Sequence, residues 1–392
     1  MINEKMFALG SQRSAIRELF EYGKKRAAEV GAENVFDYSL GNPTVPAPAC
    51  VEQAVRTVLE GGGNIHGYTS AAGDTAVRSG IAAYLQNTHG VPVAADDLYL
   101  TCGAAASLTI TLCALTAGSE DEVVILAPYF PEYTVFIGTA GAKVVAVPAD
   151  TADFQINFTA LEKALTPHTK AVIVNSPNNP SGAVYSKSTL QRLAALLTQK
   201  SAAFGTDIYL ISDEPYREIA YGVEVPFIPK LYANTLVCYS YSKSLSLPGE
   251  RIGWILVPPC AAAAKAVSAA VAGAGRALGY VCAPVLFQQV VLRCLGQTGD
   301  MSLYRANRDA LCSALGSMGY KMAKPDGAFY LFIKALEPDA VAFCERAKQH
   351  DILLVPSNSF GCEGYARLAY CVPPDMIQRS LPAFEKLAKS YR

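Results

Sequence analysis

Seven short apolar runs lie between residues 98 and 257, and they constrain the fold more than any other feature of the sequence. The longer segments between them carry apolar residues at helical spacing, as in SLTITLCALT and KSTLQRLAALLTQK. This alternation predicts an α/β fold in which a mostly parallel sheet of seven strands lies between helices. The predicted strands are LYLTC (98–102), EVVILA (122–127), AKVVAVP (142–148), AVIVN (171–175), IYLIS (208–212), TLVCY (235–239) and GWILV (253–257).

The last two of these runs are separated by only 13 residues. Two parallel strands need a crossover connection of a dozen or more residues, and that connection usually contains a helix. The short separation therefore indicates that one strand at this end of the sheet runs antiparallel to its neighbours.

The pattern changes after residue 285. Helical stretches there surround a Pro-Asp-Gly turn at 325–327 and two short apolar runs, AFYLFI and ILLVP. A chain of 392 residues exceeds what one core usually serves, so two domains are expected. We predict a large domain over residues 46–285 and a smaller α+β domain built from residues 1–45 and 286–392, because neither terminal segment carries a sheet alone.

The composition excludes several classes of partner. The formal net charge is −1 and only 17% of residues are charged, so neither nucleic acid nor an anionic membrane is an expected partner. No apolar run approaches the roughly 20 residues that span a bilayer, and the N-terminus lacks the apolar core of a signal peptide. Eleven scattered cysteines without a CxxC pair predict reduced thiols and the cytoplasm, and four distant histidines predict no metal site.

The residues that follow each predicted strand carry the candidate chemistry, because ligands of open α/β sheets bind beyond the carboxyl ends of the strands. Gly103, Ala104 and Ala105 open a helix whose free N–H groups suit a phosphate, although, taken alone, the motif favours a tight turn with close packing. Asn179, in SPNNPSG, either directs its amide at a ligand or belongs to a rigid loop.

Two later strand ends add a carboxylate and an amine. Asp213, in SDEPYRE, is either a helix N-cap or a counter-charge for a bound cation, and Tyr216 follows it. Lys243 follows Ser240 and Ser242, and Arg251 comes next. Taken alone, Lys243 reads as a solvated surface amine, whereas Arg251 suits a phosphate. Together these groups fit a cofactor with a phosphate, a phenolic oxygen, a protonatable ring nitrogen and an aldehyde, and pyridoxal phosphate (PLP) has all four.

Three motifs carry a family resemblance. SYSKSLSLPGERIG resembles the lysine motif of the PLP-dependent class I/II aminotransferases, aspartate aminotransferase-like proteins of fold type I. NSPNNPSG is similar to their asparagine loop and SDEPY to their Asp–Tyr motif, in the same order. The resemblance covers nearly the whole chain. It implies the PLP-transferase fold, a small domain built from both termini, and a homodimer with shared active sites.

The resemblance also implies roles for single residues. Lys243 would form the internal aldimine with PLP, Asp213 would pair with the ring nitrogen, and Asn179 and Tyr216 would reach the phenolic oxygen. The other expected cofactor-binding residues are Ser240, Ser242, Arg251, the Gly103–Ala104–Ala105 turn, Tyr129 in APYFPEY stacked on the ring, and Tyr68 in HGYTSAAG reaching the neighbouring subunit's phosphate.

The expected substrate-binding residues lie elsewhere in the chain. Arg367, in YARLAY, would hold the substrate α-carboxylate, and the loop at Gly41, in SLGNP, would close over it with Asn179. Arg276 lies 33 residues after Lys243, in what reads as a linker between the domains. It would bind a side-chain carboxylate or else be an ordinary surface arginine, so aspartate or glutamate with a 2-oxo acid is the favoured substrate pair.

The residue types indicate a transamination mechanism, and they also allow the alternative activities to be weighed. Substrate amine would displace Lys243, whose freed amine would move the α-proton as a general acid and base in a ping-pong transamination. A PLP-dependent β-lyase on the same scaffold is the alternative. An acyl enzyme with Ser240 as its nucleophile is disfavoured, because the S-x-x-K match at Ser240 is not accompanied by a K-T-G motif. A Rossmann oxidoreductase is disfavoured because the turn at Gly103 lacks the G-x-G-x-x-G motif. A PLP-binding regulator would need a DNA-binding domain, for which this chain has no room.

Overall fold

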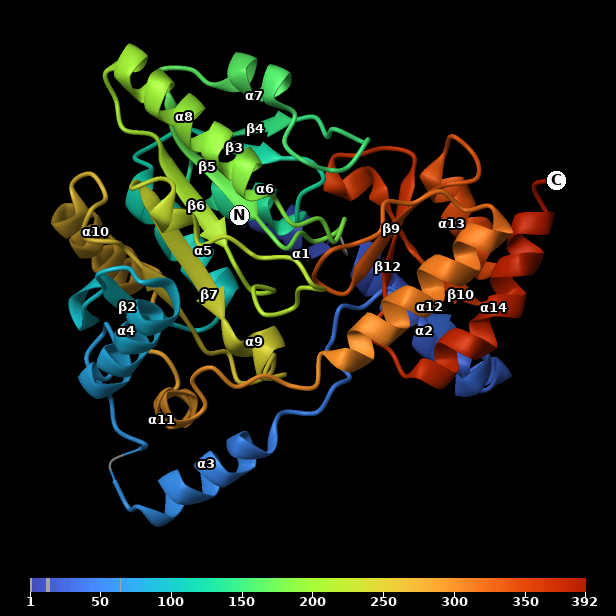
Figure 1. The fold of residues 1–392 in the computed structure, drawn as a ribbon, viewed down its shortest axis with the longest axis horizontal. Coiled ribbons are helices and arrows are strands. Elements are labelled where there is room, and N and C mark those ends of the chain that lie inside the picture. The colour runs from blue at the N-terminus through green and yellow to red at the C-terminus, as the bar shows by residue number, and fades with distance from the viewer. Residues whose placement is uncertain (1, 12–14, 64) are drawn as a thin grey trace.

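A seven-stranded sheet forms the centre of the computed structural model, which describes residues 2–11, 15–63 and 65–392 (Figure 1). Its strand order is β2-β8-β7-β6-β5-β3-β4, and only β8 runs antiparallel to its neighbours. The predicted sheet and its antiparallel strand are therefore confirmed. The strands are β2 (Leu98–Thr101), β3 (Glu122–Leu126), β4 (Lys143–Val147), β5 (Thr169–Asn175), β6 (Tyr209–Asp213), β7 (Thr235–Ser240) and β8 (Gly253–Leu256).

Helices cover both faces of this sheet, as the continuous apolar runs predicted. One face packs against α5 (Ala104–Leu115), α6 (Glu132–Thr139) and α10 (Ala264–Ala277). The other face packs against α7 (Phe158–Ala164) and α8 (Lys187–Phe204) at one end, and against α3 (Ala49–Glu60), α4 (Thr75–His89) and α11 (Val285–Arg293) at the other.

Helix α8 shows how local sequence sets an element's ends. The Ser186 side chain caps it by accepting a hydrogen bond from Thr189 N, and Gly205 ends it in the left-handed conformation at φ 66°. The predicted helical segment at 187–200 is thus confirmed and extended by four residues.

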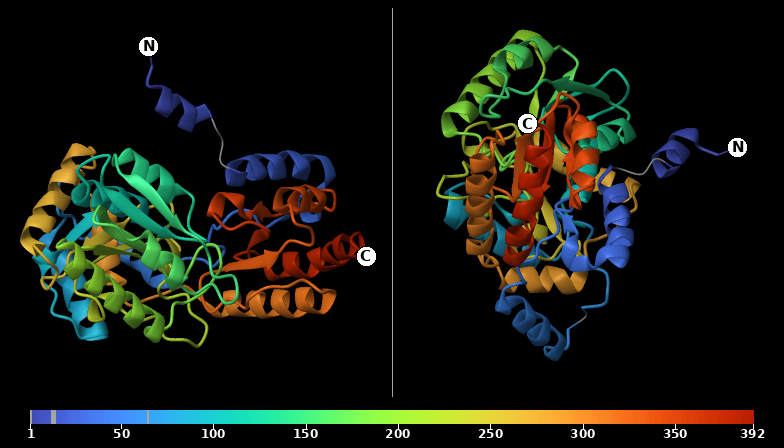
Figure 2. Two further views of the ribbon diagram at one scale, coloured as in Figure 1. Left: turned by 90° about the horizontal axis from the view of Figure 1, so that it is seen from above. Right: turned by 90° about the vertical axis from the view of Figure 1, so that its right-hand side faces the viewer.

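A second group of elements lies beside the sheet and joins the two ends of the chain (Figures 1 and 2). β1 (Phe36–Asp37) pairs in parallel with β10 (Ile352–Leu353), and β11 (Val355–Pro356), β12 (Tyr365–Ala369) and β9 (Tyr330–Lys334) form an antiparallel sheet. The run ILLVP is therefore two short strands in two sheets. Helices α2 (Ala15–Val30), α12 (Ser302–Met318), α13 (Ala340–Lys348) and α14 (Pro374–Lys389) pack around them.

The predicted division of the chain at residues 45/46 and 285/286 stays a prediction. Helix α11 begins at that second boundary and packs against α3 and α4, beside the seven-stranded sheet. The next helix, α12, packs against α14 instead. Helix α1 (Glu4–Ser11) is exposed along its length and stands away from the body of the chain in Figure 2.

Three further observations bear on function. None of the helices in residues 2–11, 15–63 and 65–392 has both the length and the apolar content needed to cross a membrane. Within the same described ranges, no three His, Cys, Asp or Glu side chains gather as a metal ion would require. All eleven cysteines are free thiols.

Candidate active site

The carboxyl ends of β5, β6 and β7 lie side by side and bring the predicted motifs together. The registers pair Asn175 with Asp213 and Asp213 with Cys238, so each strand ends within a residue or two of the next. The Asn175 side chain strengthens this edge, since it donates to the Asp213 carbonyl at 2.9 Å and accepts from Asn179 N at 2.8 Å. The asparagine loop and the Asp–Tyr motif are therefore fixed to each other.

The Asp213 carboxylate is buried, with 4% of its surface exposed, and it is not a helix cap. Its Oδ2 accepts a hydrogen bond from the Tyr133 hydroxyl at 2.5 Å, whereas its Oδ1 has no partner among the described residues. Burial raises the pKa of Asp213 to about 7, the Tyr133 bond lowers it and the neighbouring Glu214 raises it. A buried carboxyl with a free oxygen is suited to pair with a cationic N–H group.

Arg367 lies in β12 with 2% of its surface exposed. Its guanidinium donates to Asn179 Oδ1 at 3.2 Å and to the Ser39 carbonyl at 2.5 Å, while its Nε has no partner. No carboxylate within the described residues forms an ion pair with it, and burial lowers its pKa. A buried guanidinium that lacks a counter-ion is suited to bind a carboxylate ligand.

Two tyrosines complete this part of the site. The Tyr216 and Tyr330 hydroxyls lie 3.0 Å apart, and the Arg367 guanidinium stands 4.8 Å from the centre of the Tyr330 ring. Burial raises the pKa of both phenols, so they stay protonated and act as hydrogen-bond donors. Gly41 is required beside them, because a Cβ at that position would overlap the Tyr330 hydroxyl.

Lys243 projects from the four-residue helix α9 (Tyr241–Ser244), directly after β7. Its Nζ donates to the Gly41 carbonyl at 2.8 Å and lies 5.5 Å from the centre of the Phe329 ring. Burial lowers the pKa of Lys243 to about 8; Cys371 opposes this shift, and Arg251 and Arg367 add to it. A partly buried amine that is readily deprotonated is a nucleophile and a base, and not the solvated surface amine of the alternative interpretation.

Residues of the predicted phosphate site lie close together, although phosphate binding by them stays a prediction. Gly103 precedes α5 at φ 85°, a backbone conformation that favours glycine, and a Cβ there would lie 2.8 Å from Arg251 Nη2. The Arg251 guanidinium is exposed and donates to the Pro248 carbonyl at 3.0 Å. The first bond of α5 joins Ser107 N to the Gly103 carbonyl, so the N–H groups of Ala104 and Ala105 have no partner within the helix.

The remaining cofactor candidates follow β3 and β7. Ser240 and Ser242 are buried at the start of α9, and the Ser240 side chain does not cap that helix. Tyr129 is half-buried in the turn between β3 and α6, and its N–H donates to the Phe360 carbonyl at 3.0 Å. These residues lie where the resemblance expects a cofactor, but their contacts with one stay predictions.

Two candidates stand apart from the site within this chain. Tyr68 is 87% exposed in the loop between α3 and α4. Arg276 is not in a linker: it lies in the last turn of α10, which packs on α5, and the interpretation of that segment from sequence was wrong. Its exposed guanidinium has no ion pair or hydrogen bond with any described residue.

Sequence reasoning missed Tyr133 and Tyr330. Tyr133 lies in the same APYFPEY segment as Tyr129, and only Tyr129 was assigned a role there. Tyr330 belongs to AFYLFI, whose apolar neighbours suggested only a strand. The signal available in each case was a hydroxyl placed within an apolar run, since buried phenols need hydrogen-bond partners.

Comparisons with known proteins agree with this geometry. The family model for aminotransferase class I and II matches residues 32–384. A solved aminotransferase structure from Eubacterium rectale is 57% identical, covers 100% of this chain and 99% of that one, and superposes with a TM-score of 0.99.

Two relatives from Thermus thermophilus are more distant. The aspartate/prephenate aminotransferase is 30% identical over 356 residues, which are 89% of this chain and 90% of the relative. An aspartate aminotransferase solved with maleate is 26% identical, with 99% of each chain covered and a TM-score of 0.87. The match over most of the chain, together with the site built at the strand ends, shows that this protein belongs to the class I and II aminotransferases.

Proposed function

We propose that this protein uses pyridoxal phosphate, attached at Lys243, to move an amino group from an L-amino acid to a 2-oxo acid. The observation that carries the proposal is a pair of groups at the carboxyl ends of two neighbouring strands: the partly buried amine of Lys243 after β7 and the unpartnered carboxylate oxygen of Asp213 in β6. When bound, the cofactor supplies an electron-withdrawing ring that stabilises the negative charge left when a substrate proton departs.

The residues present fit the two charged ends of this cofactor. Asp213 Oδ1 needs a donor, and a protonated ring nitrogen is such a donor; the negative carboxylate in turn keeps that proton in place. At the other end, the free N–H groups of α5 and the Arg251 guanidinium suit a phosphate dianion. Tyr216 and Asn179 lie between these ends and are proposed to bind the phenolic oxygen.

Three residues are proposed to perform the chemistry on the substrate. Arg367 binds the α-carboxylate through its two-pronged guanidinium and so sets the direction in which the α-hydrogen points. Lys243 removes that proton as a base and returns it as an acid, a role that its pKa of about 8 favours near neutral pH. Donor and acceptor occupy the same Arg367 site in turn, which gives ping-pong kinetics.

Aspartate or glutamate is the proposed amino donor. The names of the Thermus thermophilus relatives support aspartate, and they also favour transamination over the β-lyase alternative. Arg276 lies exposed on α10, so it can contact a substrate only where α10 borders the site of another subunit. The exposed Tyr68 supports the same arrangement, a homodimer with shared sites, and the free cysteines support a reducing compartment such as the cytoplasm.

The test is turnover with a panel of donors by the PLP-loaded enzyme, with the absorbance spectrum recorded after each donor and the new 2-oxo acid quantified. We expect acidic donors to react faster than neutral ones in the wild type, and Arg276→Ala to remove that preference. An equal loss for both donor types would reject Arg276 as a specificity residue. Production of ammonia from donors with a β-leaving group, without amino transfer, would identify the protein as a β-lyase.

A further inference from the structure

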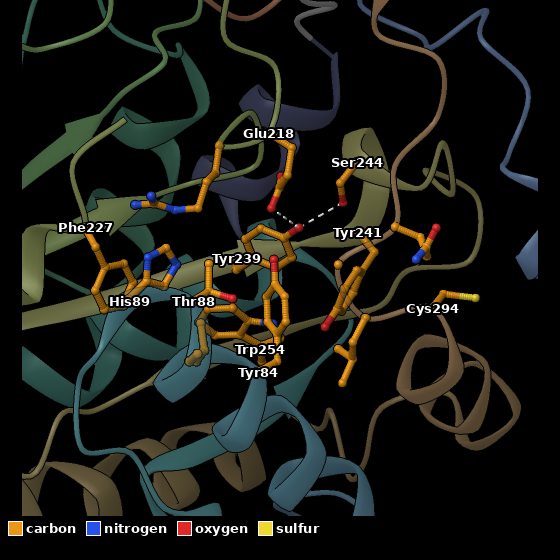
Figure 3. A pocket seen from close by; sticks show the side chains of 15 residues that line it. Tyr84, Thr88, His89, Glu218, Phe227, Tyr239, Tyr241, Ser244, Trp254 and Cys294 are labelled. Carbon is orange, nitrogen blue, oxygen red and sulfur yellow. Dashed lines mark hydrogen bonds between the residues drawn. The ribbon is translucent and has the colours of Figure 1, made fainter. Parts of the chain in front are cut away.

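A cavity of about 190 Å³ lies next to helix α9, which carries Lys243 (Figure 3). It is enclosed by the end of α4, the segment 217–227, strands β7 and β8, and residues 294–297 after α11. None of the residues assigned above to the cofactor or the substrate lines it. The cavity is therefore separate from the active site.

Six of the fifteen residues that line the cavity carry aromatic rings. The Tyr239 and Trp254 rings stack at 4.8 Å, Tyr241 meets Tyr239 edge-on at 5.1 Å, and His89 stacks on Phe227 at 4.2 Å. Figure 3 shows these rings gathered around one space. A cavity of roughly 150 Å³ holds a benzene molecule, so this one has room for a single ring with a short side arm.

One carboxylate stands among these rings. Glu218 Oε1 accepts a hydrogen bond from the Tyr239 hydroxyl at 2.9 Å, and that hydroxyl lies 2.9 Å from Ser244 Oγ as well. Glu218 Oε2 is buried and has no hydrogen-bond partner in the described structure. A buried carboxylate oxygen without a donor costs free energy that a bound N–H group recovers.

The nearest guanidinium is already engaged elsewhere. Arg217 Nε lies 2.5 Å from Glu214 Oε2, and its other nitrogens donate to the carbonyls of Val225 and Pro226. Glu218 forms no ion pair within the described residues. Burial raises its pKa, and the Tyr239 hydrogen bond and the charge of Arg217 oppose that shift. The cavity thus combines aromatic rings with one carboxylate that has no ion pair, beside the Arg217 guanidinium, whose charge is paired with Glu214.

We propose that this cavity is a binding site for a small aromatic amine, with the protonated amine at Glu218 and the ring between the aromatic walls. A protonated amine supplies both the donor that Glu218 Oε2 lacks and the charge that balances it. The same cation is attracted by the faces of neighbouring rings. A neutral aromatic molecule would pack against the rings but would not neutralise Glu218, and an anion would be repelled by the carboxylate.

The probe for the test is N,N-dimethyl-2-phenylethylamine, measured by calorimetric titration of the PLP-loaded enzyme. A tertiary amine keeps the charge and one N–H donor but cannot react with a carbonyl carbon as a primary amine does, so binding at the active site is not mistaken for binding here. We expect one site per chain. Glu218→Gln should weaken binding roughly ten- to a hundredfold, the effect of losing one charged hydrogen bond.

Two further variants keep the test decisive. Glu224→Gln removes the same charge from an exposed position nearby and should leave binding unchanged. Thr88→Trp places a large side chain at an exposed position on the cavity wall, where folding is little affected, and should abolish binding. Absence of binding to the wild type, or unchanged affinity in both Glu218→Gln and Thr88→Trp, overturns the proposal. Transamination by each variant is assayed separately, so failure of this site and failure of the proposed function are distinguished.

Discussion

The two ends of the active-site crevice differ in how complete they are within one chain. At the carboxylate end, Arg367 is 2% exposed and is held by Asn179 and the Ser39 carbonyl. At the proposed phosphate end, Arg251 is exposed, and Tyr68, which is proposed to serve the phosphate of the neighbouring subunit, is 87% exposed. The first end is fixed by the fold itself, whereas the second presents donors that its own chain leaves accessible.

This difference has a physical cause. A buried guanidinium costs much free energy unless its N–H groups are bonded, so the fold must supply most of its partners before a substrate arrives. Exposed groups at the phosphate end are solvated by water and need no such partners. Damage to the carboxylate end should therefore appear in amino-acid binding, and damage to the phosphate end in cofactor binding.

Replacing Lys243, which lies between the two ends, should have the largest effect. Lys243→Ala removes both the proposed attachment point of the cofactor and the base, and a positioned base alone contributes roughly 10²- to 10⁴-fold. We expect no measurable transamination even when PLP is bound, as judged by single-turnover absorbance. The exposed Lys265, changed to Ala, is the matched control. Near-normal turnover in Lys243→Ala would rule the assignment out.

Arg367→Leu should impair the binding of amino acids at the carboxylate end and leave cofactor binding unchanged. Loss of a two-pronged charged contact lowers kcat/KM for amino acids by roughly 10²- to 10⁴-fold, while the affinity for PLP stays close to that of the wild type. Arg367→Lys keeps the charge but not the planar fork, so it should recover part of the loss. Steady-state kinetics and cofactor titration separate the two quantities, and a parallel loss of both would contradict the division between the ends.

Tyr68→Phe should weaken cofactor binding at the phosphate end, and this effect should be smaller than that of Arg367→Leu on amino-acid turnover. One hydrogen bond to a charged group contributes about 1.5–3 kcal/mol, so PLP binding should weaken roughly ten- to a hundredfold while kcat at saturating cofactor is retained. Fluorescence titration of the cofactor measures this change.

The shared site that Tyr68 implies has its own test. Tyr68→Ala and Lys243→Ala chains are unfolded and refolded together. If Tyr68 serves the neighbouring subunit, each hybrid dimer contains one site with both lesions and one with neither, so activity partly returns. Hybrid dimers without activity would place Tyr68 in its own chain's site or outside it.

The smallest effect is expected from Tyr133→Phe. The Tyr133 hydroxyl holds the pKa of Asp213 down against the effect of burial, so removing it should raise that pKa above about 7. Because the ionised carboxylate is the useful form, the acid limb of the pH profile of kcat/KM should move to higher pH, with less than tenfold loss at high pH. Tyr185→Phe, at another buried tyrosine, is the control. An unmoved acid limb would make Tyr133 a packing residue only.

Much of the site was predictable because strand ends can be recognised in a sequence. Asp213 and Lys243 each follow an apolar run directly, and parallel strands bring such positions to one edge of the sheet. Tyr133 and Tyr330 were not predictable in the same way. Both lie within apolar segments, where nothing local distinguishes a tyrosine that meets Asp213 or Tyr216 from one that only fills space.

The sequence by itself determined the seven strands, their alternation with helices, the presence of one antiparallel strand and the chemical groups at the strand ends. These features depend on residue periodicity and on turn residues, which act over short stretches of chain. Tertiary structure alone decided that Arg276 lies in a helix on the large sheet, that Gly41 contacts Lys243 and Tyr330, and that Glu218 Oε2 lacks a hydrogen-bond partner. Each of these depends on segments far apart in sequence, whose approach is set by the packing of the whole fold.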